Sequence, residues 1–250
     1  MTMMIPAATL VLFRPGADGV AEVLMMERAG GMAFAAGAMV FPGGRVDPGD
    51  HAVAAGMAAG CDPESAVARV AAVRETIEEV GIAVGLVPAP DAASVARLRA
   101  GLAAGQDFGG LLAGEGLRLE ADALTPFARW RPNAPERRNF DTLFFVAEAP
   151  ADAIASADGG ESVRVTWATP QALLDAADAG HHHVIFPTRR NLERLAQLST
   201  IAIARAHAAD HPVTVITPFL EMREGEEWLC IPEGCGYPVT AEPMSRVRRG

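Results

Sequence analysis

Apolar residues at intervals of three and four predict one well-defined helix in this sequence. The positions that share this spacing are Val70, Val73, Ile77 and Val80. Asp62 followed by Pro63 is typical of a helix N-terminus, and Gly81 is typical of a helix end. We therefore expect a helix over residues 63–80 with one apolar stripe.

Short apolar runs separated by turn residues predict strands on both sides of this helix. The runs cover residues 7–13, 21–27, 124–130, 140–147 and 162–167, and a final hairpin is expected from 213–221 and 227–231. Further helices are expected over residues 170–179 and 188–208. Residues 85–122 are rich in alanine and glycine and predict a short helical excursion over 94–102, followed by a loop.

Length and composition limit the classes of protein that remain. The chain has 250 residues, 50% of them hydrophobic and 21% charged, so we expect one large core and a single domain. Lysine and arginine number 21 against 31 aspartates and glutamates, a net charge of −10. That charge repels polyanions and argues against a nucleic-acid polymer as partner. No apolar run approaches the roughly 20 residues of a membrane span, and the start lacks the basic region of a signal peptide.

The cysteines and a histidine tract carry little functional signal. Cys61, Cys230 and Cys235 do not form a disulfide pattern, which fits a reducing cytoplasm as the expected location. Cys230 and Cys235 lack a second pair, so we expect structural thiols in place of a zinc site. Three successive histidines at 181–183 cannot share one face of a helix or strand, which favours an exposed loop over a metal tract.

Three carboxylates on the predicted helix suggest a chemical role. Glu75, Glu78 and Glu79 stand at i, i+3 and i+4, so they form one patch facing away from the apolar stripe. Like charges this close repel unless a cation neutralises them, and oxygen ligands suit Mg²⁺ or Mn²⁺. The alternative is a solvated face on which Arg74 pairs with Glu78.

The segment Arg74-Glu75-Thr76-Ile77-Glu78-Glu79-Val80-Gly81-Ile82 resembles the second half of the Nudix box, R-E-U-x-E-E-x-G-U, with threonine where a bulky aliphatic residue is usual. Gly44 matches the glycine that opens the box. The box places a glutamate six residues after that glycine, where this chain has Asp50, and 23 residues then separate Asp50 from Arg74 in place of the usual seven. Asp50 and Glu64 are both candidates for the missing first glutamate.

An insertion inside the box, here at about residues 51–65, resembles the coenzyme A diphosphatase-like branch of the family. Arg28 followed by Gly37 and by the run Phe41-Pro42-Gly43-Gly44 is similar to the R-x-x-x-G-x-x-x-F-P-G-G element of these enzymes, with a longer first gap. Segments 137–142 and 186–192 also look like parts of this branch. The resemblance implies a Nudix α/β/α sandwich with a mixed sheet, enlarged by the helical excursion at about 85–122 and a C-terminal extension, all in one domain over residues 1–250.

The resemblance also implies roles for the residues of the box. The catalytic set would be Arg74, Glu75, Glu78 and Glu79. Glu78 and Glu79 would be the main metal ligands and Glu75 a further ligand or the group that deprotonates water, while Arg74 would hold the carboxylates in place. Gly44 would let its backbone approach the metal. Glu161, just before a predicted strand, is a candidate for an additional catalytic carboxylate.

Substrate binding needs cations, because guanidinium groups grip phosphate with two parallel hydrogen bonds. The candidates are Arg28, Arg45 and Arg138, with the neighbouring Arg137 and the backbone of Gly43. The expected function is a metal-dependent hydrolase of nucleoside diphosphates linked to X, preferably coenzyme A or acyl-coenzyme A. The alternatives are nucleotide sugars, ADP-ribose or dinucleotides as substrates, or a non-hydrolytic ligand-binding or regulatory protein. The oligomeric state stays open, with a homodimer as one alternative.

Overall fold

The computed structural model describes residues 4–31, 35–57, 62–132 and 139–247. Its centre is a mixed sheet built around the long strand β1 (Met4–Arg14). β1 runs parallel to β8 (Asn139–Glu148) and antiparallel to β2 (Glu22–Arg28) and β4 (Gly43–Arg45). The sheet is therefore mixed, as predicted.

Four more strands complete this sheet. They are β3 (Met39–Val40), β7 (Thr125–Trp130), β9 (Ser162–Ala168) and β10 (Val215–Ile216). β7 and then β10 extend the sheet beyond β8, whereas β3 and β9 both pair with β2.

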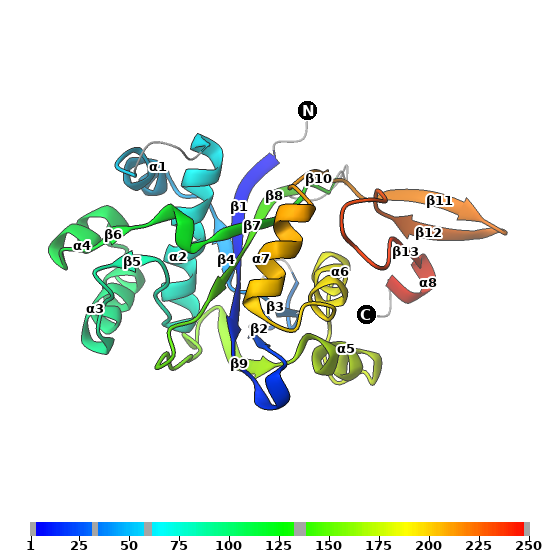
Figure 1. Cartoon of the computed structure of the whole chain (residues 1–250), viewed down its shortest axis with the longest axis horizontal. Coiled ribbons are helices and arrows are strands. Elements are labelled where there is room, and N and C mark those ends of the chain that lie inside the picture. The colour runs from blue at the N-terminus through cyan, green and yellow to red at the C-terminus, as the bar shows by residue number, and fades with distance from the viewer. Residues whose placement is uncertain (1–3, 32–34, 58–61, 133–138, 248–250) are drawn as a thin grey trace.

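Helices cover both faces of the sheet (Figure 1). One side carries α1 (Pro48–Ala55), α2 (Pro63–Val80), α3 (Ala92–Ala103) and α4 (Phe108–Gly114), and the other carries α5 (Pro170–Asp178), α6 (Phe186–Leu195) and α7 (Ile201–Asp210). This is the predicted α/β/α sandwich. None of the described helices combines the length and apolar character needed to cross a membrane.

Smaller elements complete the fold. They are the 3-10 turns η1 (Ala17–Gly19) and η2 (Ala121–Ala123), the two-stranded sheet β5 (Leu86–Val87) and β6 (Arg118–Leu119), the three-stranded sheet β11 (Phe219–Arg223), β12 (Glu226–Cys230) and β13 (Ala241–Pro243), and the short helix α8 (Met244–Val247). The three-stranded sheet and α8 form the C-terminal extension (Figure 1).

Alternation along β1 divides the core between the two faces. Leu10 and Leu12 pack in the cluster that contains α2, whereas Val11 and Phe13 pack in the cluster beneath α5, α6 and α7. Because successive side chains of a strand point to opposite faces, this one strand supplies both cores.

Helix α2 has the predicted bounds, and its ends have the predicted chemistry. Asp62 accepts a hydrogen bond from the Ser65 amide at 2.9 Å. Gly81 adopts the left-handed conformation, with φ at +70°, and its amide donates to the Ile77 carbonyl at 3.0 Å. The valine and isoleucine stripe is fully buried. Thr76, the departure from the box pattern, is also buried and donates to the Ala72 carbonyl at 2.7 Å, so its hydroxyl is satisfied within the helix.

Three expectations on secondary structure are wrong. The single helix over 188–208 is in fact α6 and α7, because Thr200 caps a new helix by accepting from the Ile203 amide at 3.2 Å. The loop expected after residue 102 contains α4, which Asp107 caps. Val215 and Ile216 belong to the main sheet, so the final hairpin is the shorter pair β11 and β12.

Tyr237 anchors the C-terminal extension to the sandwich. Its buried hydroxyl donates to Asn191 Oδ1 at 2.8 Å and accepts from Trp130 Nε1 at 3.0 Å. Its ring meets the Trp130 ring edge to face, with centroids 5.8 Å apart. The extension is thereby joined to β7 and α6 through a satisfied polar contact inside the core.

Replacing Tyr237 with phenylalanine tests whether the extension folds with the rest of the chain. Asn191 and Trp130 would each lose a buried hydrogen-bond partner. We therefore expect a loss of about 1–3 kcal/mol in the free energy of unfolding. Urea unfolding followed by circular dichroism and tryptophan fluorescence should show one transition, shifted to lower urea. Val239→Ala, at an exposed position of the same segment, should change stability by less than about 0.5 kcal/mol. Two separate transitions in the wild type would contradict the single-domain expectation.

Candidate active site

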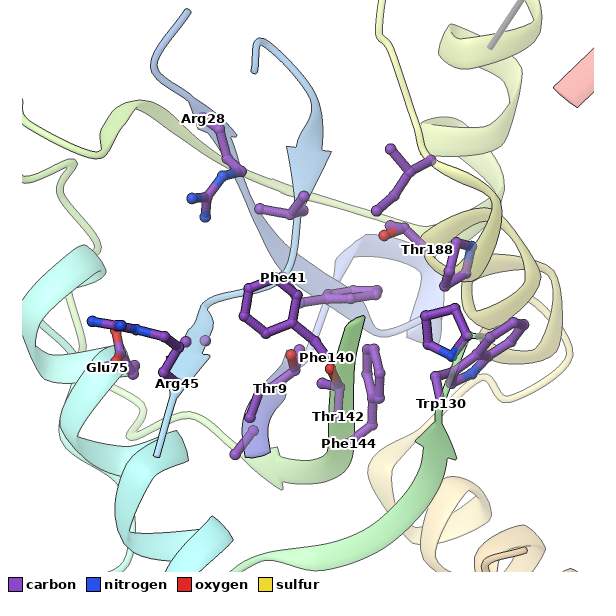
Figure 2. A pocket seen from close by; sticks show the side chains of 18 of the residues that line it. Thr9, Arg28, Phe41, Arg45, Glu75, Trp130, Phe140, Thr142, Phe144 and Thr188 are labelled. Atoms are coloured by element: carbon purple, nitrogen blue, oxygen red, sulfur yellow. The ribbon is translucent and has the colours of Figure 1, made fainter. Parts of the chain in front are cut away.

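A cavity of about 380 Å³ opens between the edge of α2 and the N-terminus of α6 (Figure 2). Its polar end is lined by Arg28, Gly43, Gly44, Arg45, Glu75 and Glu161. Its aromatic end is lined by Phe41, Trp130, Phe140 and Phe144. The polar end thus collects residues from β2, β4 and α2 that are far apart in the sequence.

Arg74 is the hub that holds the polar end together. Its Nε and Nη2 donate to the two carboxylate oxygens of Asp50 at 2.9 and 3.0 Å. Nη2 also donates to the Arg45 carbonyl at 2.8 Å, and Nη1 donates to Glu75 Oε1 at 2.9 Å. Burial alone would lower the pKa of Arg74, but its bonds to Asp50 and the charges of Glu75 and Asp50 outweigh it and raise the pKa. One guanidinium therefore ties α1, β4 and α2 together.

The partners of Asp50 and Glu64 decide between the two candidates for the first acidic residue of the box. Asp50 is 1% exposed, pairs with Arg74, and also accepts from the Asp47 amide at 2.8 Å. Glu64 binds Arg129 instead, at 2.6 and 2.9 Å. Asp50 thus joins the Arg74 cluster, and Glu64 does not.

The carboxylates of α2 carry negative charge that the protein itself neutralises incompletely. Burial raises the pKa of Glu75 to about 7, although Arg74 partly offsets it. Burial and the charge of Glu75 raise the pKa of Glu79 well above its usual range, against the opposing hydrogen bond from the Gly43 amide at 2.8 Å. Burial also raises the pKa of Glu78. The three groups together form a site short of positive charge.

The two glycines of β4 permit close packing of the protein on itself. A Cβ at Gly44 would overlap the carboxylate of Glu75, and a Cβ at Gly43 would overlap the Ala8 carbonyl on β1. Gly43 also has φ at +154°, where a side chain would be strained. The glycines thereby allow Glu75 and Glu79 to lie against the strand that forms the cavity floor.

The donor set suits a hard divalent cation. In the part of the chain that the structure describes, no three His, Cys, Asp or Glu side chains already converge as a metal cage. Glu75 is turned toward Arg74 and Glu79 toward the Gly43 amide. However, carboxylate oxygens of raised pKa on one helix edge, beside the unobstructed backbone of Gly44, are the ligands that Mg²⁺ or Mn²⁺ prefers. The residues present fit such an ion.

Comparison with known proteins identifies the family. No protein-family model matches this sequence, and no curated protein matches it. The solved structure of a Nudix hydrolase from Alicyclobacillus acidocaldarius superimposes with a TM-score of 0.72 at 27% identity, covering 82% of this chain and 97% of that chain. This chain belongs to the Nudix superfamily.

Two more distant Nudix structures also match. The MutT Nudix hydrolase of Burkholderia pseudomallei is 16% identical, with a TM-score of 0.43, covering 76% of this chain and 97% of its own. A Nudix hydrolase from Nitrosomonas europaea is 14% identical, with a TM-score of 0.43, covering 87% of this chain and 81% of its own.

The predicted substrate cations of this Nudix protein divide into two groups. Arg28 and Arg45 line the polar end of the cavity, and neither forms a salt bridge with a described residue (Figure 2). The buried Nε of Arg28 also lacks a hydrogen-bond partner among the described residues. Arg137 and Arg138 lie outside the described residues. Arg28 and Arg45 are thus available to an anionic substrate.

Glu161, the candidate for an additional catalytic carboxylate, lies at the polar end of the cavity. It is exposed, lines the cavity, and is close enough to Glu75, Glu78 and Glu79 to raise the pKa of each. Glu161 directly precedes β9, which pairs with β2, and its carbonyl accepts from the Ala29 amide at 2.8 Å, so it lies beside the polar end.

Other sequence candidates lie apart from this cavity. Cys230 and Cys235 are free thiols, and Cys61 lies outside the described residues. His181 and His183 are exposed and His182 is partly so. These placements agree with the predictions of free thiols at Cys230 and Cys235 and of a surface loop at residues 181–183.

Sequence reasoning missed Arg99, which supports the site from behind. This residue of α3 donates to the Glu78 carbonyl at 3.0 Å and to the Glu79 carbonyl at 3.1 Å. It also binds Ser156 through both the hydroxyl and the carbonyl. A cation at a helix C-terminus satisfies its free carbonyls. The excursion at 85–122 thereby fixes the end of α2 that carries the carboxylates, a role no local pattern indicated.

Replacing Arg99 with alanine should loosen this end of α2. The carbonyls of Glu78 and Glu79 would lose charge-assisted bonds, so we expect a loss of about 2 kcal/mol in the free energy of unfolding and weaker Mn²⁺ binding. Urea unfolding and calorimetric Mn²⁺ titration measure the two effects. Arg97→Ala is the matched control, because Arg97 is on the same helix and its contacts, with Glu115 and Ser94, are exposed and do not involve α2. Equal Mn²⁺ affinity in both variants would contradict the positioning role.

Replacing Glu79 with glutamine should stabilise the metal-free protein at alkaline pH. The raised pKa of Glu79 means that the folded state binds a proton more tightly than the unfolded state does. Above the pKa of the folded state, Glu79 is ionised in both states, and its buried charge lowers the free energy of unfolding. At pH 8 we expect a gain of about 1 kcal/mol, shrinking to nothing as pH falls below the unfolded pKa. Chemical unfolding in chelator at pH 8 and pH 4 measures it, with the exposed Glu148→Gln as control. A loss of stability at pH 8 would overturn the charge assignment.

Proposed function

We propose that this Nudix protein is a metal-dependent hydrolase that cleaves the diphosphate linkage of a nucleoside diphosphate linked to X. One observation carries the proposal: Glu75 and Glu161 line the same end of one cavity as Arg28 and Arg45, and neither arginine forms a salt bridge with a described residue. Glu78 and Glu79 stand beside Glu75 on α2, and burial raises the pKa of all three carboxylates. The carboxylates suit a divalent cation, and the arginines suit phosphate oxygens. The Nudix fold supports a hydrolase of pyrophosphate bonds.

Each residue of the polar end has a task in this reaction. Arg28 and Arg45 bind the diphosphate oxygens and orient the linkage across β4. Arg74 holds Glu75 in place, and the Gly43 amide holds Glu79. When bound, Mg²⁺ or Mn²⁺ would supply charge neutralisation and polarise a phosphorus centre.

Glu75 is the preferred proton acceptor. With a pKa raised to about 7, its carboxylate can take a proton from water near neutral pH. The water oxygen then bonds to one phosphorus, the bridging P–O bond breaks, and the bridging oxygen leaves on the other phosphate. Glu161, which also lines the polar end, is the alternative acceptor. The products are two phosphate-terminated fragments.

Coenzyme A or an acyl-coenzyme A is the proposed substrate class. Two features support it: the sequence element that joins Arg28 to Phe41-Pro42-Gly43-Gly44 resembles that of coenzyme A diphosphatases, and its Arg28, Phe41, Gly43 and Gly44 all line the cavity. The aromatic end offers Phe41 and Phe140 to a flat nucleobase. Nucleotide sugars, ADP-ribose and dinucleotides are the alternative substrates. A non-hydrolytic ligand-binding protein is the alternative function, and the intact carboxylate set argues against it.

Replacing Glu78 with glutamine should abolish hydrolysis without disturbing the fold. The side chain is 39% exposed, so its charge is dispensable for folding, whereas a metal ligand is not dispensable for turnover. We expect a loss of about a hundredfold or more in kcat, measured by mass-spectrometric detection of products from coenzyme A, ADP-ribose, dinucleotides and nucleotide sugars with Mg²⁺, Mn²⁺ or chelator. Glu64→Gln, on the same helix but paired with Arg129, is the matched control and should stay active. Silence of the wild type across this panel, with metal bound, would favour the non-hydrolytic alternative.

A further inference from the structure

The N-terminus of α6 forms part of the cavity wall, beside the aromatic end. Ile185, Pro187 and Thr188 all line the cavity, and Figure 2 shows the Thr188 side chain directed into it. These residues lie on the face of the sheet opposite α2. The cavity therefore joins Glu75 of α2 to the start of α6.

The first turn of α6 is not capped by the protein. Helices α2, α3, α5 and α7 begin at Asp or Thr residues whose side chains accept from the first turn. Helix α6 begins after Ile185, which has no side chain to cap it, and its first turn holds no acidic residue. The amides of Phe186 and Thr188 have no acceptor within the helix, and neither donates to another described residue. The donors at this helix end are unsatisfied.

Thr188 supplies an independent observation that points to a ligand. The residue is 5% exposed, and its hydroxyl has no hydrogen-bond partner among the described residues. The hydroxyl oxygen itself stays accessible, so water or a ligand in the cavity can satisfy it. Because the hydroxyl faces the cavity, the missing partner belongs to whatever fills the cavity.

The groups at this point are donors, so the ligand must bring several acceptors. The Thr188 hydroxyl lies with the free amides of the first turn at the positive end of a helix dipole, an arrangement that suits the oxygens of a phosphate. The carboxylates among the cavity-lining residues, Glu75 and Glu161, belong to the polar end and not to this one. A ring nitrogen supplies one acceptor, whereas a phosphate monoester supplies three oxygens.

We propose that the N-terminus of α6 and the hydroxyl of Thr188 bind a second phosphate of the substrate, a monoester group separate from the diphosphate that is cleaved. The inference rests on the proposed function in one respect only, namely that the scissile diphosphate occupies the polar end. The site then selects substrates by a phosphate remote from the reacting atoms, a feature that coenzyme A has and dephospho-coenzyme A lacks.

Binding of adenosine 3′,5′-bisphosphate and of AMP, measured by calorimetry with Mg²⁺ present, tests the site without any turnover. The two nucleotides differ by one phosphate monoester. We expect the bisphosphate to bind about tenfold more tightly, since two or three charge-assisted hydrogen bonds supply that difference. Equal affinity for both nucleotides would overturn the proposal.

Two variants assign the preference to this helix end. Thr188→Val removes the hydroxyl at nearly constant volume and should reduce the tenfold ratio to about threefold. Ile185→Asp places a carboxylate where the phosphate would bind and caps the helix, so it should erase the ratio while raising the thermal midpoint. Thr214→Val, at an exposed position, is the matched control and should keep the full ratio.

The possible results separate the two proposals. A ratio that stays unchanged in Thr188→Val and in Ile185→Asp would place the second phosphate elsewhere and overturn the inference. The proposal is supported if the wild type shows the ratio, Thr188→Val reduces it and Ile185→Asp abolishes it, even if the protein hydrolyses nothing. Hydrolysis of coenzyme A and dephospho-coenzyme A at equal kcat/KM would support the hydrolase and overturn the second phosphate site.

Discussion

The buried pair of Arg74 and Asp50 is the interaction on which the polar end of the cavity depends. It joins the first turn of α1, the Arg45 carbonyl of β4 and the carboxylate-bearing edge of α2 through one guanidinium. Removing one partner of such a pair leaves a buried charge without compensation, typically at a cost of about 3–5 kcal/mol. The pair also bridges the insertion within the Nudix box, because α1 and α2 are separate helices that this contact keeps in register. The long insertion is therefore compatible with an intact site.

Two buried carboxylates near this pair lower the stability of the folded protein when they are ionised. Glu75 and Glu79 are buried with raised pKa values, so their ionised forms are disfavoured in the folded protein. Under the proposed function, a bound divalent cation would offset that penalty. The positions that weaken the folded state are also those that the proposed reaction uses.

Two additions to the sandwich support the cavity from different sides. The excursion at 85–122 supplies Arg99, which binds the carbonyls at the end of α2. The C-terminal extension supplies Tyr237, which fixes Trp130 through its indole N–H. Trp130 in turn lines the aromatic end. Segments with no motif of their own thus position side chains at both ends of the site.

Local pattern was enough to predict those elements whose signals lie within a few residues. The stripe of α2, its Asp62 cap and its Gly81 end depend on contacts inside one helix, and they appear with the predicted bounds. The i, i+3 and i+4 spacing of Glu75, Glu78 and Glu79 follows from helical geometry alone. The division of 188–208 into two helices escaped prediction, because both halves are apolar on one face and only the Thr200 cap marks the break.

The sequence by itself determined the helix, the acidic cluster and the family resemblance, because each is a property of neighbouring residues. Tertiary structure alone decided that Asp50, not Glu64, pairs with Arg74, that Arg99 caps α2, and that Thr188 meets the same cavity as Glu75. These pairs are separated by about 20 to more than 100 positions in the chain. Their proximity is set by the order of strands in the sheet and by which face each helix covers, and no short-range periodicity encodes either.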